Sequence, residues 1–206
     1  MKTFIKLCGF KYIEDIIFAT SLNINYLGMI FVKNVQRTVN LDTAVQGAKI
    51  CKDKGIKSVG VFLNQDLSEI EKILSKVDLD MLQLHGTENI DDYKVFNKDI
   101  IKTLHISEEL PLKVKDLDFD NVTYLLDTSS NHLQGGTGKC FDWSILKDIP
   151  VEKLFVAGGL KPDNILDLLS SYEPKCVDVS SGIEKESGHK DHNLMSEFVQ
   201  KVRAYQ

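Results

Sequence analysis

Short apolar runs alternate with amphipathic segments along almost the whole chain. The runs are nearly continuous in hydrophobicity, which is typical of strands that are buried on both faces of a parallel sheet. They predict eight strands, near residues 3–8, 26–31, 57–62, 80–85, 100–105, 121–127, 152–157 and 175–180.

The segments between these strands carry helix signals. The helix from about Leu41 should end at Gly55, residues 66–69 resemble a capping box, and Pro162 suits the first turn of a later helix. The segment 108–119 predicts a short or irregular helix. The expected buried faces are Ile13, Ile16, Ile17 and Thr20; Ile70, Ile73, Leu74 and Val77; Ile165, Leu168 and Leu169; and Leu194, Met195, Phe198 and Val202.

Strict alternation of strands and helices predicts a parallel sheet. Eight such units favour an α/β fold of the closed (β/α)8 type, a TIM barrel, formed by residues 1–206 as a single domain. The alternative is a doubly wound open sheet. Its first turn usually carries a Gly-x-Gly-x-x-Gly sequence, whereas this chain has Cys8-Gly9-Phe10-Lys11.

The residues that could do chemistry lie where the predicted strands end. Cys8, His85 and Asp127 close the first, fourth and sixth strands, and glycines follow the seventh and eighth. Barrels of this type place their active sites at the C-terminal ends of the strands, commonly with a phosphate site after strands seven and eight. We therefore interpret these residues as candidates for one active site.

Cys8 and Asp127 are the candidate catalytic residues. A thiol has a pKa of about 8.5, close enough to neutrality for a positive neighbour to produce a thiolate nucleophile or base. A partly desolvated carboxyl has a raised pKa and can act as a general acid. The structural alternatives are a small buried hydrophobe for Cys8, as we expect for Cys51 and Cys176, and a carboxylate that caps a loop for Asp127.

Glycines after the last two strands predict a phosphate site. Gly158, Gly159, Ser181 and Gly182 would let backbone N–H groups approach an anion closely, helped by the N-terminus of the helix near Pro162. For either pair alone, a tight turn is the simpler interpretation. Gly136 lies in a glycine-rich loop after the sixth strand. This loop could cover the site as a lid, with Gly136 at the phosphate, or could be a flexible connector.

Arg37, His85 and Asp178 are candidates for substrate binding. Arg37 could hold a carboxylate through two parallel hydrogen bonds, and His85 could donate a hydrogen bond. Asp178 could orient sugar hydroxyls or pair with a cation. A surface arginine and a structural histidine are the alternatives. The histidines and cysteines match no metal-binding spacing, so we expect no metal.

Composition and charge narrow the functional classes. The 206 residues have a net charge of −5 and no Lys/Arg-rich run, which argues against nucleic acid as a partner. No segment reaches the roughly 20 apolar residues of a membrane span, and no signal peptide is recognisable. Cysteines without paired spacing fit a reducing compartment. We expect a cytoplasmic protein that does not bind membranes and is a monomer, with a homodimer as the alternative.

Short strings from the first strand to the last helix resemble phosphoribosylanthranilate isomerase. They occur in the order and with the spacing of that family. They are Lys6-Leu7-Cys8-Gly9, Val59-Gly60-Val61-Phe62, Leu82-Gln83-Leu84-His85-Gly86, Leu125-Leu126-Asp127, Gly135-Gly136-Thr137-Gly138, Phe141-Asp142-Trp143, Ala157-Gly158-Gly159-Leu160 and Val177-Asp178-Val179-Ser180-Ser181-Gly182-Ile183-Glu184, followed by Gly188-His189-Lys190-Asp191.

The resemblance implies an enzyme of tryptophan biosynthesis that needs no cofactor and no metal. The family converts N-(5-phosphoribosyl)anthranilate into 1-(2-carboxyphenylamino)-1-deoxyribulose 5-phosphate, an Amadori rearrangement. The resemblance implies that Asp127 is the acid that assists ring opening and that Cys8 is the base that removes the proton from the sugar C2. It also implies that Arg37 holds the anthranilate carboxylate and that the glycines hold the phosphate.

Two positions depart from the family pattern. Val35 and Lys11 stand where Ser and Thr are frequent, which concerns the second loop and the first turn. Three other functions are alternatives. The histidine-pathway ketol isomerase has an Asp at the position of Cys8, and indole-glycerol-phosphate synthase needs a Lys acid on an early strand, for which we find no counterpart. A non-catalytic phosphosugar-binding barrel would need neither Cys8 nor Asp127.

Overall fold

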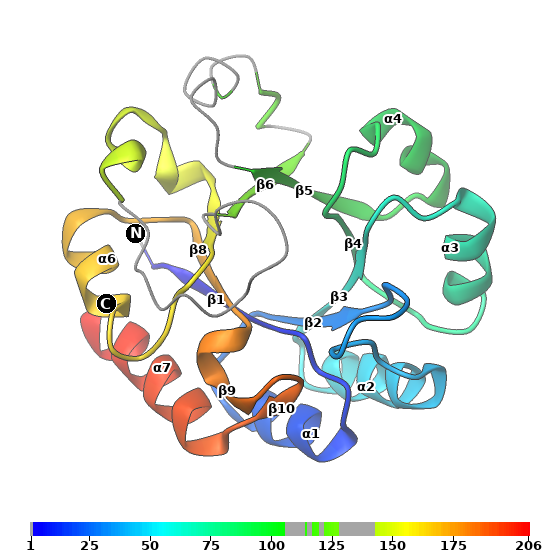
Figure 1. Ribbon diagram of the computed structural model, residues 1–206, viewed down its shortest axis with the longest axis horizontal. Coiled ribbons are helices and arrows are strands. Elements are labelled where there is room, and N and C mark those ends of the chain that lie inside the picture. The colour runs from blue at the N-terminus through cyan, green and yellow to red at the C-terminus, as the bar shows by residue number, and fades with distance from the viewer. Residues whose placement is uncertain (1, 106–113, 115–116, 120–121, 128–142) are drawn as a thin grey trace.

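The computed structural model describes residues 2–105, 114, 117–119, 122–127 and 143–206. Eight parallel strands form a closed barrel, in which each strand pairs with the next and the eighth pairs with the first. Helices surround this ring of strands (Figure 1). The predicted (β/α)8 barrel is therefore confirmed, and the open sheet is wrong.

The strand predictions agree with the structure within two residues at nearly every end. The strands are β1 (Phe4–Cys8), β2 (Tyr26–Ile30), β3 (Lys57–Phe62), β4 (Met81–Leu84), β5 (Asp99–His105), β6 (Thr123–Asp127), β7 (Phe155–Ala157) and β8 (Cys176–Val179). The seventh was predicted too long, because the residues after Pro150 form a 3-10 turn, η3 (Val151–Lys153). The other 3-10 turns described are η1 (Lys94–Phe96), η2 (Trp143–Asp148) and η4 (Ser181–Ile183).

The helices confirm most of the predicted buried faces. They are α1 (Ile13–Ser21), α2 (Leu41–Asp53), α3 (Leu67–Leu74), α4 (Ile90–Tyr93), α6 (Ile165–Ser171) and α7 (His192–Tyr205). Gly55 follows α2 with a φ of +68°, a conformation that favours glycine, so the predicted helix end is confirmed. Most of the segment 108–119 lies outside the described residues.

Three details of the predicted helices are wrong. Ile17 is 55 % exposed, because α1 buries Ala19 beside Ile16 instead. The capping box does not form, since Asp66 makes no side-chain cap and Glu69 pairs with Lys33. The helix expected near Pro162 begins only at Ile165, after a turn.

A short antiparallel hairpin follows the barrel and was not predicted. Its strands, β9 (Glu184–Glu186) and β10 (His189–Lys190), lie between β8 and α7 and are joined across Gly188, whose φ is +83°. The hairpin lies near α1 in Figure 1. A contact between Tyr12 Oη and His189 Nε2, at 3.3 Å, connects it to the turn before α1.

The interior of the barrel changes from apolar to polar along the strands. Side chains alternate between the two faces of a strand, so every second residue points inward. The inward positions begin with residues such as Met81, Ile101 and Leu125, which belong to one apolar cluster. The polar residues Gln83, Thr103 and Asp127 come two positions later on the same strands. The polar side chains therefore gather at the C-terminal end of the barrel.

Candidate active site

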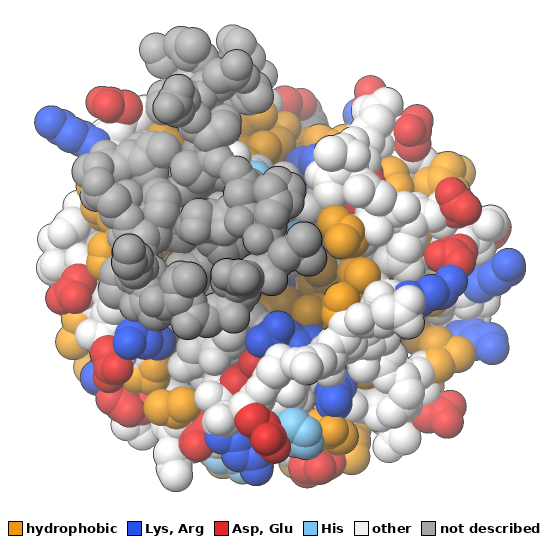
Figure 2. All heavy atoms as spheres, viewed as in Figure 1, with side chains coloured by type: hydrophobic (Ala, Val, Ile, Leu, Met, Phe, Trp, Pro, Cys, Tyr) orange, Lys and Arg blue, Asp and Glu red, His pale blue; other side chains and the backbone are white. Residues whose placement is uncertain are grey.

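A cavity of about 810 Å³ opens at the C-terminal end of the barrel. Figure 2 shows a hollow near the middle of this face, bordered by hydrophobic side chains and by Lys or Arg side chains. The cavity brings together most of the predicted site residues. Those that line it are Cys8, Arg37, His85, Asp127, Gly158, Gly159, Asp178 and Ser181.

Cys8 ends β1 and is only 6 % exposed. The neighbouring strand makes room for it, because a Cβ at Gly28 would lie 2.5 Å from the Cys8 sulfur. Burial raises the pKa of the Cys8 thiol, and the positive charge of Lys6 opposes this rise. The thiol is therefore a group whose ionisation depends on the charges packed around it.

Lys6 and Asp178 form a buried ion pair beneath Cys8. Lys6 Nζ lies 2.9 Å from Asp178 Oδ2, and both side chains are almost completely buried. Burial raises the pKa of Asp178, and Lys6 acts against this. Among the described residues, none donates a hydrogen bond to the buried Asp178 Oδ1. This oxygen is an acceptor at the wall of the cavity.

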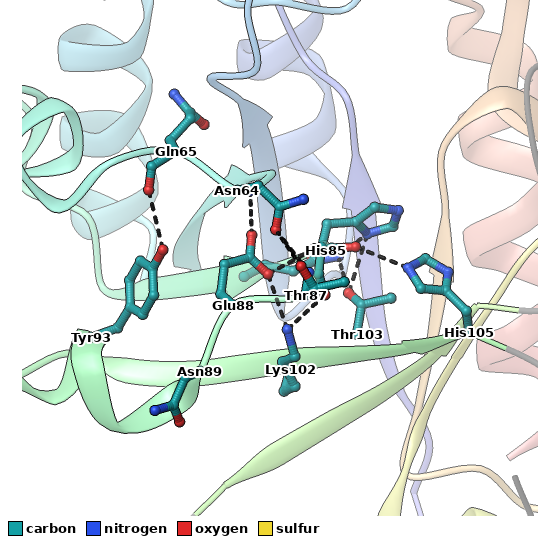
Figure 3. Close-up of polar contacts among 12 residues, drawn as sticks. Asn64, Gln65, His85, Thr87, Glu88, Asn89, Tyr93, Lys102, Thr103 and His105 are labelled. Carbon is teal, nitrogen blue, oxygen red and sulfur yellow. Dashed lines mark hydrogen bonds and ion pairs between the residues drawn. The ribbon is translucent and has the colours of Figure 1, made fainter.

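His85 and Asp127 meet on the other side of the cavity. His85 Nε2 lies 3.6 Å from Asp127 Oδ2 at the end of β6. Its other ring nitrogen, Nδ1, lies 3.2 Å from Thr103 Oγ1 (Figure 3). Burial lowers the pKa of His85, and the Asp127 carboxylate partly offsets this. A neutral imidazole beside the carboxyl is therefore the favoured form near neutral pH.

The loops that hold His85 are joined by a buried charge network (Figure 3). Glu88 is nearly inaccessible and accepts hydrogen bonds from the backbone N–H groups of Asn64 and Gly86 and from Lys102 Nζ, the last at 3.0 Å. Burial would raise the pKa of Glu88, but these hydrogen bonds outweigh it and lower the pKa. The network fixes the loops after β3 and β4 to β5.

Arg37 lines the cavity, but its guanidinium is already paired. Its Nε and one Nη donate to the two carboxylate oxygens of Glu184, at 2.8 and 2.7 Å. Lys190 Nζ, also buried, lies 2.9 Å from Glu184 Oε1. Burial opposes the charge of Glu184, yet hydrogen bonds from Arg37 and Lys190 lower its pKa. The two-bond geometry expected for a substrate carboxylate is thus occupied by a residue of the hairpin.

Glu184 and Lys190 are residues of the cavity region that the sequence analysis did not single out. Their signal was the pattern Glu184-Lys185-Glu186-Ser187-Gly188-His189-Lys190, in which Ser-Gly marks a turn between two charged stretches. This pattern could have indicated a turn near Gly188, but it does not indicate which residue Glu184 pairs with. Arg37 and Glu184 are 147 positions apart, so only the closed barrel brings them together.

The two departures from the family pattern lie at the edge of the cavity. Lys11 Nζ donates to the carbonyl of Gln36 at 3.0 Å and so joins the turn after β1 to the loop that carries Arg37. Val35 is 43 % exposed and lines the cavity. Val35 is therefore part of the loop that carries Arg37, and Lys11 contacts this loop from the turn after β1.

The glycines after β7 and β8 have two different structural roles. Gly158 and Gly159 have φ values of +95° and +65°, which side chains rarely adopt, and they line the cavity. Gly182 does not line it. A Cβ there would lie 1.9 Å from the carbonyl oxygen of Leu160, so Gly182 lets the loops after β7 and β8 pack together. Gly136 lies outside the described residues.

The described residues contain no group of three or more His, Cys, Asp or Glu side chains that could hold a metal ion.

Proteins of known activity resemble this chain over nearly its full length. The protein from Caldanaerobacter subterraneus subsp. tengcongensis named N-(5'-phosphoribosyl)anthranilate isomerase is 40% identical, with 97% of each chain covered. The protein of the same name from Aquifex aeolicus is 34% identical, and the comparison covers 97% of this chain and 98% of the relative.

Solved structures show the same architecture. The crystal structure of phosphoribosyl anthranilate isomerase from Thermotoga maritima superposes with a TM-score of 0.82 at 28% identity and covers 98% of this chain and 99% of that one. A structure of the enzyme in complex with reduced 1-(o-carboxyphenylamino)-1-deoxyribulose 5-phosphate has a TM-score of 0.79, also at 28% identity, with the same coverage of both chains.

A family model confirms what the barrel and these relatives indicate. The model described as N-(5'phosphoribosyl)anthranilate (PRA) isomerase matches residues 5–201, which include β1 from Ile5 onward, all of β2 to β8 and most of α7. The chain therefore belongs to the N-(5'-phosphoribosyl)anthranilate isomerase family and is an isomerase of tryptophan biosynthesis.

Proposed function

We propose that Cys8 and Asp127 carry out the proton transfers by which this isomerase converts N-(5'-phosphoribosyl)anthranilate into 1-(2-carboxyphenylamino)-1-deoxyribulose 5-phosphate. The observation that supports this most is that both residues, from β1 and β6, line one cavity. A base and an acid on separate strands can reach different atoms of the same bound sugar. The two groups have opposite proton tasks, which requires such a separation.

Asp127 starts the reaction in this proposal. Its carboxyl gives a proton to the ring oxygen of the ribose while the bond between that oxygen and C1 breaks. The anthranilate nitrogen supplies the electrons and becomes an iminium ion. An acid that performs this step must be protonated when the substrate binds, with its O–H directed at the ribose ring oxygen. His85 Nε2 lies 3.6 Å from Asp127 Oδ2 and is the neighbour of this carboxyl on the β4 side of the cavity.

Cys8 performs the second proton transfer. Its thiolate takes the proton from C2, the C–H electrons form a double bond between C1 and C2, and the iminium electrons return to nitrogen. The resulting enolamine gains a proton at C1 and loses the hydroxyl proton at C2, which leaves the ketone. Because the iminium acidifies the C2–H bond, a modest base such as a thiolate is sufficient.

The remaining candidate residues bind the substrate in this proposal. Arg37 faces the anthranilate carboxylate, and Glu184 fixes the guanidinium in one orientation beforehand. Asp178 Oδ1 accepts a hydrogen bond from a sugar hydroxyl, and His85 contacts the sugar. Gly158, Gly159 and Ser181 hold the phosphate with backbone groups, with Gly182 supporting them and Gly136 joining from outside the described residues. The structure of the similar enzyme with a phosphorylated product analogue supports this class of ligand.

We also propose that the chain works as one domain over residues 1–206, as a monomer in the cytoplasm. All eight strands contribute to one barrel. Cys8, Cys51 and Cys176 are buried free thiols, and a thiolate base needs a reducing compartment. One similar structure is of monomers generated from the dimeric enzyme of Thermotoga maritima. A homodimer is therefore the alternative, and sedimentation velocity distinguishes the two states.

No helix among the described residues is long and apolar enough to cross a membrane.

The test of the acid is the substitution Asp127→Asn. Freshly made phosphoribosylanthranilate is fluorescent, so its decay with and without protein measures turnover. We expect a loss of kcat of at least about 100-fold, because general acid catalysis contributes this much or more, while the product analogue still binds. The exposed Asp148→Asn is the matched control and should behave as wild type. Near-normal turnover of Asp127→Asn would refute the assignment.

A further inference from the structure

Two buried lysines lie against the residue that acts as base. We propose that Lys6 and Lys190 are positioning residues that stabilise the thiolate form of Cys8 inside the cavity. This inference rests on the proposed function, which gives Cys8 the task of a base.

Lys6 approaches Cys8 from within the barrel. It lies two residues earlier on β1, so its side chain is on the same inward face of the strand. The side chain is fully buried, and its ammonium is 2.9 Å from Asp178 Oδ2. Lysines are almost never fully buried unless their charge is paired. The ion pair with Asp178 holds the ammonium below the sulfur.

Lys190 approaches Cys8 from the hairpin side. Its ammonium donates to the carbonyl oxygen of Ser180 at 3.0 Å and lies 2.9 Å from Glu184 Oε1. A Cβ at Gly9, the residue directly after Cys8, would be 3.3 Å from Lys190 Nζ. The side chain is 1 % exposed, so little water screens its charge. The hairpin therefore places the buried ammonium of Lys190 next to the turn that follows Cys8.

Cations and carboxylates from several elements surround Cys8. The cations are Lys6 on β1, Lys190 on β10 and Arg37 in the loop after β2. The carboxylates of this cluster are Asp178 on β8 and Glu184 on β9, and Glu184 is shared by Arg37 and Lys190. Asp127 on β6, which interacts electrostatically with Asp178, and His85 after β4 line the same cavity. Lys6 and Lys190 differ from Arg37 in being almost completely buried, so water screens their charges little and both favour a thiolate at Cys8.

The influences on the pKa of Cys8 agree with the positions of the two lysines. Burial raises the pKa of Cys8, Lys6 is the largest influence that lowers it, and Lys190 lowers it further, while Asp178 adds to the rise. Removal of either lysine should therefore raise the pKa of Cys8 and reduce the fraction of thiolate near neutral pH.

The pH dependence of alkylation by iodoacetamide tests this directly, because only the thiolate reacts. The Cys8→Ser variant gives the background from the other cysteines. We expect Lys190→Met to move the midpoint of Cys8 alkylation upward by about one pH unit, which is about a tenfold slower reaction at neutral pH. Lys6→Met should move it in the same direction. Lys190→Arg should restore most of the wild-type profile, and the exposed Lys185→Met should leave it unchanged.

The outcomes separate this inference from the proposed function. An unshifted midpoint in folded Lys190→Met, or a shift that Lys190→Arg does not reverse, would overturn the inference. Lys6→Met can fail to fold, because buried Asp178 loses its partner. In that case the comparison of Lys190→Met with Lys190→Arg tests the inference by itself. If Lys190→Met shifts the midpoint while Cys8→Ser keeps full turnover, the thiolate stabilisation stands and the catalytic task of Cys8 falls.

Discussion

At the residue scale, the site consists of ionisable groups held by charged partners, and burial outweighs the partners in the pKa of Cys8, His85 and Asp178 but not in that of Glu184. That Cys8, His85 and Asp127 line one cavity could be predicted from the sequence, because the C-terminal ends of barrel strands lie at the same end of the barrel. Their charge partners could not. An ion pair between residues far apart in the chain, as in Arg37 and Glu184, depends on the register of strands and loops and leaves no local pattern.

The substitution Cys8→Ser tests the base at this scale. A serine hydroxyl is a far weaker acid than a thiol, so we expect kcat to fall at least about 100-fold with little change in KM. Steady-state kinetics with the fluorescent substrate measures both. If only KM changed, Cys8 would be a packing residue.

The wild-type pH profile provides a second test of Cys8. Burial raises the pKa of its thiol above the ordinary value, and the base is active only when deprotonated. The rate at which iodoacetamide alkylates Cys8 in the wild type should therefore rise as the pH rises from about 6 toward about 9. A rate of alkylation that does not change over this range would contradict an ionisation of Cys8 with a raised pKa.

At the element scale, strands were predicted better than helix ends and turns. A strand that is buried on both faces appears in the sequence as a short apolar run, and all eight barrel strands were predicted from such runs. The start of a helix depends on which side chain accepts hydrogen bonds from the first backbone N–H groups of that helix. Asp66 and Glu69 have the residue types of a capping box, yet Lys33 pairs with Glu69, and this competition comes from another loop. The β9–β10 hairpin is too short and too charged to give an apolar pattern.

The loops after β3 and β4 should depend on Glu88. Replacement by Gln removes the charge that pairs with the mostly buried Lys102, so we expect Glu88→Gln to lower the free energy of unfolding by about 1–3 kcal/mol. Urea unfolding at pH 7 measures this. The partly exposed Glu69→Gln, which loses the exposed partner Lys33, is the control and should change stability little.

The effect of Glu88→Gln should also depend on pH. The pKa of Glu88 is lowered in the folded protein, so its contribution to stability is present above the unfolded pKa of about 4.3 and is lost as the pH falls through the folded pKa. The difference between variant and wild type should therefore shrink below about pH 4. A difference that grew on acidification would contradict this role of the carboxylate.

At the scale of the whole molecule, closure of the barrel joins the two ends of the chain. The termini lie close together in Figure 1, and β1 pairs with β8. Arg203 on α7 donates hydrogen bonds to the carbonyl oxygens of Thr3 and Asn23 and to Asn25 Oδ1. This arginine connects the last helix to the residue before β1 and to the loop before β2.

The substitution Arg203→Ala should weaken this closure. We expect the free energy of unfolding to fall by about 1–3 kcal/mol, because several hydrogen bonds to backbone oxygens are lost. Arg203→Lys keeps the charge but not the planar fork, and should recover only part of the loss. Equal stability of Arg203→Lys and the wild type in urea would show that the charge alone is sufficient.

The most direct test of the central claim is a crystal structure of this chain with the reduced product analogue bound. We predict the sugar C2 within about 3.5 Å of the Cys8 sulfur and the Asp127 carboxyl within about 3 Å of the oxygen that corresponds to the ribose ring oxygen. The phosphate should lie at Gly158, Gly159 and Ser181. An analogue that leaves either Cys8 or Asp127 out of contact with the sugar would contradict the account.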